Sequence, residues 1–204
     1  CVCLIMELNY VIFGNGIIKV DFTLLPQETL PNIPKVGMQC GIPKTYSNII
    51  WFGKGLLENY IDRCYGFDAG IYSLPINHFI EPYVKPQENA NRTDVRWMFL
   101  SDNKNEGILI VADSLLSMSA WPYTEENMIK AKHTNELIYS NYITLNIDLI
   151  QMGVGGNDSW SDVAQPLIQY QIPSKVYNYS FYLLPNKLNH EKINQKAKEI
   201  KGID

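Results

Sequence analysis

The residues best suited to chemistry in this sequence lie in three short stretches that combine polar, glycine and aromatic residues. The densest is 82–97, where seven of the eight residues after Pro86 carry side chains able to form hydrogen bonds. Asn91 and Arg92 lie in this run. Planar amides, carboxylates and guanidinium groups suit the paired hydroxyls of a sugar, and they equally suit a buried polar network that holds a loop. The residues alone leave both interpretations open.

A second stretch, 152–160, has three glycines in four residues and ends in Trp160. Glycine allows close approach of the backbone to a neighbour. A short polar run that contains Asp158 precedes the indole. A single Trp is more often part of a core, but this setting favours a projecting side chain more than usual.

The third stretch, 51–63, contains a Gly-Lys-Gly sequence that lacks the spacing of a phosphate-binding loop. It also carries Glu58, Asp62 and Arg63. We expect these charged groups to hold the loop together by hydrogen bonds, and we favour this role over contact with a ligand.

Other catalytic signatures are missing from the sequence. The three histidines, His78, His133 and His190, are too far apart in the chain to form a local metal cluster. There is no G-x-S-x-G elbow, and no Cys has a His nearby in the sequence. The cysteines at positions 1, 3, 40 and 64 follow neither zinc spacing nor a disulfide framework, so we expect buried free thiols.

Length and composition indicate one folded domain. The chain has 204 residues, of which 46% are hydrophobic and 19% charged. We predict a domain over 1–185 and a charged tail over 186–204. The net charge of −4 argues against nucleic acid as a partner, and no apolar run is long enough to span a membrane. The apolar start without Met suggests a fragment of a longer polypeptide.

The elements that must position these stretches are strands. Apolar and polar residues alternate over 144–149, 168–172 and 177–181, which predicts strands with one apolar and one solvent-facing side. Glycines around Asn15 predict a hairpin, and further strands are expected at 35–42, 48–52, 93–100, 107–112 and 115–120. In the body, only 125–133, after Thr124 as N-cap, reads as a helix. We expect the tail from 188 to be frayed or exposed.

Together the three stretches resemble the C-terminal domain of family 2 β-galactosidases of the lac type, called domain five or the small-chain domain. The matched patterns are W-x-G-x-G-x-x-E-N-Y-x-D-R, P-Y-x-x-P-Q-E-N-G-N-R-T-D-V-R-W and M-G-x-G-G-D-D-S-W. A fourth match covers 123–125 and 131–137. The departures are Ala90 in place of Gly, Asn157 in place of Asp and Leu56 in place of Pro.

The resemblance implies an all-β fold: an antiparallel supersandwich like that of galactose mutarotases, truncated at its N-terminus, with one short helix. It implies a non-catalytic domain of a retaining β-galactosidase, packed against a catalytic barrel of the same polypeptide in a homo-oligomeric parent. Trp160 then forms an aromatic wall of the galactoside site, with Asp158, Asn91 and Arg92 as further substrate-binding candidates. The catalytic carboxylates and the magnesium and sodium ligands lie in other domains, so no catalytic residue, metal ligand or cofactor is expected here.

Two other functions are consistent with this fold. One is a free-standing sugar epimerase of the mutarotase type, which must carry its own general acid and base. The other is an independent carbohydrate-binding module. Galactose anomer interconversion by the purified chain would identify the first, and sugar binding without the barrel would identify the second.

Overall fold

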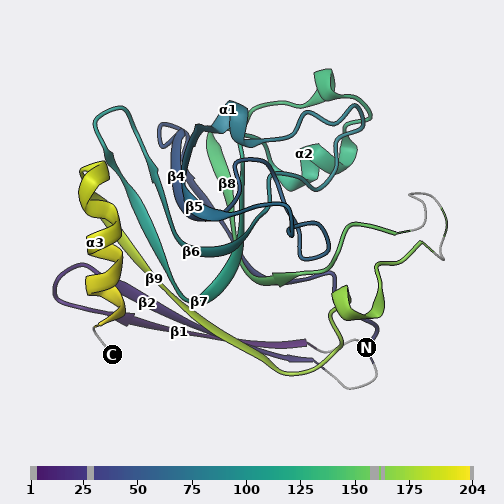
Figure 1. The fold of residues 1–204 in the computed structure, drawn as a ribbon, viewed down its shortest axis with the longest axis horizontal. Helices are drawn as coiled ribbons and strands as arrows, with labels where there is room; N and C mark the ends of the chain where they lie inside the picture. The colour runs from purple at the N-terminus through teal and green to yellow at the C-terminus, as the bar shows by residue number, and fades with distance from the viewer. Residues whose placement is uncertain (1–3, 27–29, 157–160, 162–163, 203–204) are drawn as a thin grey trace.

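The computed structural model describes residues 4–26, 30–156, 161 and 164–202. Over this part of the chain, antiparallel strands form one strongly curved sheet (Figure 1). The strands are β1 (Leu4–Ile12), β2 (Ile18–Pro26), β3 (Lys35–Pro43), β4 (Asn48–Lys54), β5 (Ala69–Pro75), β6 (Arg92–Ser101), β7 (Glu106–Trp121), β8 (Tyr142–Gln151) and β9 (Tyr177–Lys187). The predicted all-β, antiparallel, sandwich-like fold is confirmed.

The long strand β7 organises the sheet. The strand order is β1-β2-β9-β7-β6-β4-β5, and β8 also pairs with β7 and carries β3 on its other edge. The first half of β7 pairs with β9 and its last five residues pair with β8. The pairing register between β6 and β7 shifts on both sides of Val95, next to Asp94, which has a φ of 54°. We predicted two strands here, but one strand changes partner along its length.

The hairpin at the start of the chain is confirmed. Strands β1 and β2 pair in register, and the Phe13 amide donates to the Ile17 carbonyl over 2.8 Å. Gly16 has a φ of 84°, a conformation that glycine adopts without steric cost. The glycines therefore fix this turn, as the sequence indicated.

Apolar side chains form a core on each face of the sheet. The larger core lies under a layer of loops and includes Trp51, Phe79 and Trp121. The smaller one, which includes Trp97 and Tyr182, is covered by a C-terminal helix. Because both faces are covered, polar residues of the strands are also buried in places.

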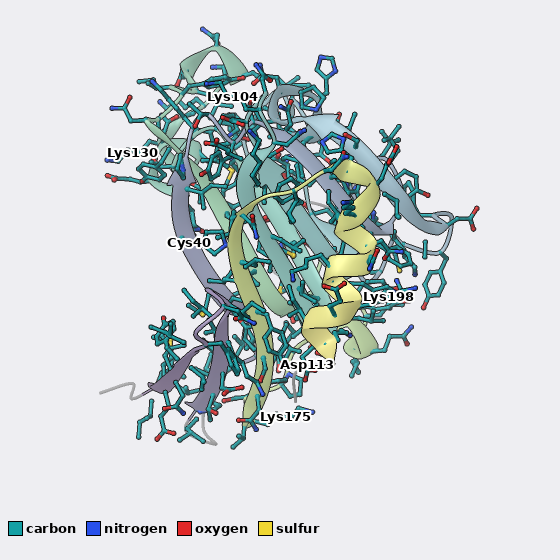
Figure 2. The ribbon with its side chains drawn as sticks, turned by 90° about the vertical axis from the view of Figure 1, so that its left-hand side faces the viewer. Cys40, Lys104, Asp113, Lys130, Lys175 and Lys198 are labelled. Carbon is teal, nitrogen blue, oxygen red and sulfur yellow. The ribbon has the colours of Figure 1, made fainter. Side chains whose placement is uncertain are left out.

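The C-terminal helix α3 (His190–Lys201) lies along the sheet, as Figure 2 shows. Its residues Ile193, Ala197 and Ile200 are buried against the smaller core. The Trp97 indole donates to the Asn194 side chain over 3.2 Å. The expectation of a frayed or exposed end is wrong for this helix, because a stripe of apolar residues spaced along it packs on the sheet.

The other helices are short. Helix α2 (Glu125–Lys130) begins as predicted, since the Thr124 hydroxyl accepts from the Asn127 amide, but it ends before residue 133. The single helical turn α1 (Ile76–Phe79) was not predicted. None of the helices in the described residues is long and apolar enough to cross a membrane.

Some sequence expectations differ from the structure. Ile168–Tyr170 is a 3₁₀ turn and not a strand. Strand β5 was missed. Cys64 is a buried free thiol as expected, whereas the free thiol Cys40 belongs to an exposed residue of β3. The residues of β8 predicted to face solvent, such as Asn146 and Asp148, are buried, since Asn146 is hydrogen-bonded to Gln39 of β3 and Ser119 of β7 and Asp148 lies beside Lys35 of β3.

Candidate functional site

The three stretches singled out in the sequence meet in the loop layer above the larger core. Asp62 of the 51–63 stretch accepts a hydrogen bond from the Gly155 amide over 2.6 Å. Glu58 of the same stretch accepts one from the Ala90 amide over 2.8 Å. Segments far apart in the sequence are therefore joined at one place by two carboxylates.

Glu58 fastens the first two stretches together. Besides the Ala90 amide, the buried Glu58 carboxylate accepts hydrogen bonds from the Arg63 guanidinium and the Tyr83 hydroxyl. Burial and the neighbouring Glu58 carboxylate raise the pKa of Tyr83, so this hydroxyl stays protonated and donates. Charged hydrogen bonds of this kind are among the strong ones in proteins. The predicted role of these groups as a loop clamp is confirmed.

Ala90 has an unusual backbone. Its φ is 66°, in the left-handed region that favours glycine. This is the position at which the matched pattern has Gly, so the departure noted in the sequence falls on a strained residue. The hydrogen bond from its amide to Glu58 helps to hold that conformation.

A pair of buried asparagines connects the same two stretches. The Asn59 amide donates to the Asn91 carbonyl over 2.9 Å, and the Asn91 side chain donates to the Asn59 carbonyl over 2.8 Å. The Asn59 side-chain oxygen accepts from both the amide and the hydroxyl of Thr93. The side-chain amides of both asparagines thus hydrogen-bond to backbone groups where β6 begins, in place of pairing between strands.

Arg92 is buried between aromatic rings. Its guanidinium carbon lies 4.2 Å from the centre of the Phe79 ring and 5.2 Å from that of Trp51. Its nitrogens donate to the carbonyls of Asn91 and Phe79. Burial lowers the pKa of Arg92 to about 10, and nearby Glu58 partly opposes this change. The side chain therefore remains charged at neutral pH and is stabilised by ring faces and carbonyls.

The predicted substrate-binding residues differ in what the structure tells of them. Asn91 and Arg92 are each only 1% exposed, so the structure supports the buried-network interpretation of their stretch. Sugar contact by either side chain stays a prediction. Trp160 and Asp158 lie outside the described residues.

A second group of charged side chains was missed in the sequence. Lys35 of β3 lies 3.5 Å from a carboxylate oxygen of Glu88 and 4.0 Å from one of Asp148 in β8. Its ammonium also lies 5.5 Å from the centre of the Trp121 ring. Burial raises the pKa of the Glu88 carboxyl, and it raises that of Asp148 to about 8, although Lys35 opposes both shifts. The alternation over 144–149 predicts a solvent-facing Asp148, and this prediction is wrong because the residue is buried.

Metal binding is not evident in the part of the chain that the structure describes. There, no three His, Cys, Asp or Glu side chains are placed to hold an ion. The carboxylates of the loop layer bind cations and amides of the chain itself. Chemically, this arrangement can fix loops and shape a surface.

Comparison with known proteins gives one family. A family model described as "Beta galactosidase small chain" matches residues 3–183. A β-galactosidase of Priestia megaterium is 32% identical over 87% of this chain and 17% of its own length. One of Vibrio cholerae is 34% identical over 82% and 16%, and one of Pseudoalteromonas haloplanktis is 35% identical over 85% and 16%. The chain thus spans about a sixth of the length of these curated relatives.

Proposed function

The chain belongs to the β-galactosidase small-chain family, and from this premise we propose that it is a non-catalytic domain of a retaining β-galactosidase. Such an enzyme hydrolyses terminal β-D-galactosides. The domain would pack against a separate catalytic barrel and complete its sugar site. The small share of each relative that the chain matches supports a role as one part of a larger enzyme.

The proposal rests mainly on the finding that the carboxylates of the loop layer are bound by other groups of the chain. A retaining glycosidase needs two carboxyl groups about 5–5.5 Å apart, one as acid and one as nucleophile. In the loop layer, Glu58 and Asp62 are bound by amides and cations of the chain, and Asp94 lies 3.3 Å from Lys54. These groups already have structural partners, which argues against a role in catalysis.

Among the residues that the structure describes, Glu88 and Asp148, which both lie beside Lys35, are another pair of acids to consider. Burial raises the pKa of both carboxyls, whereas the nucleophile of a retaining enzyme must be ionised. The side chain of Asp148 is only 2% exposed, which leaves little room for a sugar carbon to reach it. We therefore infer that this pair does not perform the hydrolysis.

A turnover assay tests the absence of catalysis. The purified chain should release no nitrophenol from a nitrophenyl β-galactoside above the rate of a buffer control. The variants Glu88→Gln and Asp148→Asn serve as matched tests of the two acids. Turnover that rises with the amount of chain and is lost in either variant would overturn the proposal.

The family resemblance further suggests that Trp160 forms an aromatic wall against the sugar. The structure supports a fixed starting point for this segment, because the Met152 amide donates to the Pro34 carbonyl and the Gly153 amide to the Tyr170 carbonyl. Together with the bond from Gly155 to Asp62, these contacts join residues 152–155 to the residue before β3, to the 3₁₀ turn Ile168–Tyr170 and to the 51–63 stretch.

Replacing this indole in the intact galactosidase tests its role. Trp160→Ala should weaken substrate binding by about 5- to 150-fold, because an aromatic contact contributes on the order of 1–3 kcal/mol. Trp160→Phe, which keeps a ring, should lose less. Unchanged kcat and KM for lactose in Trp160→Ala would show that this residue does not touch the substrate.

A further inference from the structure

A polar pocket opens at the end of the sheet where β3, β8 and the start of α2 come together. It consists of a cavity of about 410 Å³ and a smaller one of about 190 Å³, which share Lys35 and Glu125. Glu88 and Gln151 line the larger cavity and Asp148 lines the smaller one. The larger volume falls within the range of small-molecule sites.

Several buried polar atoms of this pocket lack a hydrogen-bond partner, although Lys35 Nζ forms ion pairs with Glu88 and Asp148. Among the residues that the structure describes, nothing hydrogen-bonds to Lys35 Nζ, Glu88 Oε1, Asp148 Oδ2 or Gln151 Oε1. The Asp148 side chain is almost fully buried, since only 2% of it is exposed. Unpartnered polar atoms that are buried are costly to a fold, and a cluster of them calls for an explanation.

The backbone makes room for this cluster. Gly37 lies at a shift in the register between β3 and β8. A Cβ at Gly37 would lie only 1.9 Å from Oδ1 of Asp148, so no larger residue fits without movement. The Lys35 ammonium is held over the Trp121 ring, close to both carboxyls. Glycine and ring together place the charged groups at the pocket.

The unpartnered atoms specify the chemistry of a ligand. At the larger cavity, Oε1 of Glu88 and Oε1 of Gln151 can accept hydrogen bonds, and the ammonium of Lys35 can donate one beyond its two ion pairs. A metal cation is disfavoured because Lys35 lies among the oxygens, and an anion is disfavoured because the acidic residues Glu88 and Glu125 line the larger cavity. A neutral molecule with several hydroxyl groups satisfies both the acceptors and the donor.

We propose that this pocket is a binding site for a neutral polyhydroxy molecule of about the size of a monosaccharide. The pocket is lined by described residues of this chain, and the proposal rests neither on the catalytic barrel nor on a role for Trp160. It can therefore be present or absent whatever the outcome of the tests of the proposed function.

Titration of the ¹⁵N-labelled chain with D-galactose at fixed pH tests the proposal. We expect saturable shifts of the amide signals of Gly37, Gln151 and Met152, with a Kd on the order of millimolar, as is usual for a small ligand. Magnesium chloride and inorganic phosphate are titrated in parallel. Binding of either ion in place of the sugar, or no shift at these amides with D-galactose, would overturn the proposal.

Variants then assign the contacts. Gln151→Leu removes an acceptor that lacks a hydrogen-bond partner and Lys35→Met removes the donor, and each should weaken D-galactose binding by about tenfold. Glu125→Gln changes a carboxylate that lines both cavities, while Glu126→Gln changes its neighbour on α2, which lines neither cavity, and should leave the Kd unchanged. Amide spectra report whether each variant is folded. Folded Gln151→Leu with an unchanged Kd would contradict this location.

Discussion

Replacing Asp148 by Asn should make the chain more stable at neutral pH. Burial raises the pKa of this carboxyl to about 8, from an ordinary value of 3.8. Between about pH 4 and pH 8 the folded chain therefore holds a proton that the unfolded chain releases. An asparagine side chain at this position would have nearly the same shape and would not ionise, so the variant avoids this difference between the two states.

The sign of the effect follows from proton binding. Where the folded state binds more protons than the unfolded state, the free energy of unfolding falls as pH rises, by about 1.4 kcal/mol per pH unit for one proton. From about pH 4 to pH 7 the loss due to Asp148 is on the order of 2–4 kcal/mol. Glu88, whose pKa is also raised by burial, acts in the same direction and is present in both proteins.

Urea unfolding followed by circular dichroism between about pH 4 and pH 8 measures this effect. The two proteins should have similar stability near pH 4, and Asp148→Asn should become the more stable one by on the order of 2–4 kcal/mol at about pH 7. Asp113→Asn, which changes an exposed carboxyl, is the control. A difference between Asp148→Asn and the parent that does not vary with pH would refute the reasoning.

Two other substitutions test the packing by urea unfolding. Arg92→Lys should lower the free energy of unfolding by about 1–3 kcal/mol, because Lys cannot keep both the contacts with two rings and the two hydrogen bonds of the guanidinium. The control Arg96→Lys, at a partly exposed site, should lower it less. Equal losses in the two variants would count against the argument. Ile193→Ala should cost about 2–5 kcal/mol because Ile193 of α3 is fully buried against the sheet, whereas Ile129→Ala on the exposed side of α2 should change stability by under about 0.5 kcal/mol. A small loss in Ile193→Ala would mean that α3 does not stabilise the sheet.

Much of the sheet could be predicted because its signals are local. Alternation over 177–181 and the glycines beside Asn15 each determine a strand or a turn through residues close in sequence. The burial of the polar residues of β8 could not be predicted from such local signals. Asn146 and Asp148 alternate like a solvent-facing side, but they are buried beside residues distant in the sequence, such as Lys35, Gln39 and Ser119.

The C-terminal helix shows a second limit of local patterns. In the sequence, the few apolar residues Ile193, Ala197 and Ile200 stand among charged and polar ones, a pattern that is also typical of an exposed tail. Only the apolar surface of the sheet around Trp97 makes this stripe a packing face. The burial of α3 therefore depends on the sheet surface that it packs against and cannot be predicted from the sequence of the helix alone.

The candidate site was predictable in part. The charges of the 51–63 stretch indicated a clamp, and Glu58 forms one. The sequence did not decide between sugar contact and a buried network for Asn91 and Arg92, because the same groups serve both. The pocket around Lys35 was out of reach, since its members come from strands and loops far apart in the chain.

The central claim, a non-catalytic domain that completes a β-galactosidase, is tested most directly by reconstitution. The initial rate of lactose hydrolysis is measured for this chain alone, for a polypeptide carrying the catalytic barrel of the same enzyme without this region, and for their mixture. The account predicts no hydrolysis by the chain, a reduced rate for the barrel polypeptide, and recovery in the mixture. Hydrolysis by the chain alone, or a barrel polypeptide whose full rate does not change when the chain is added, would contradict it.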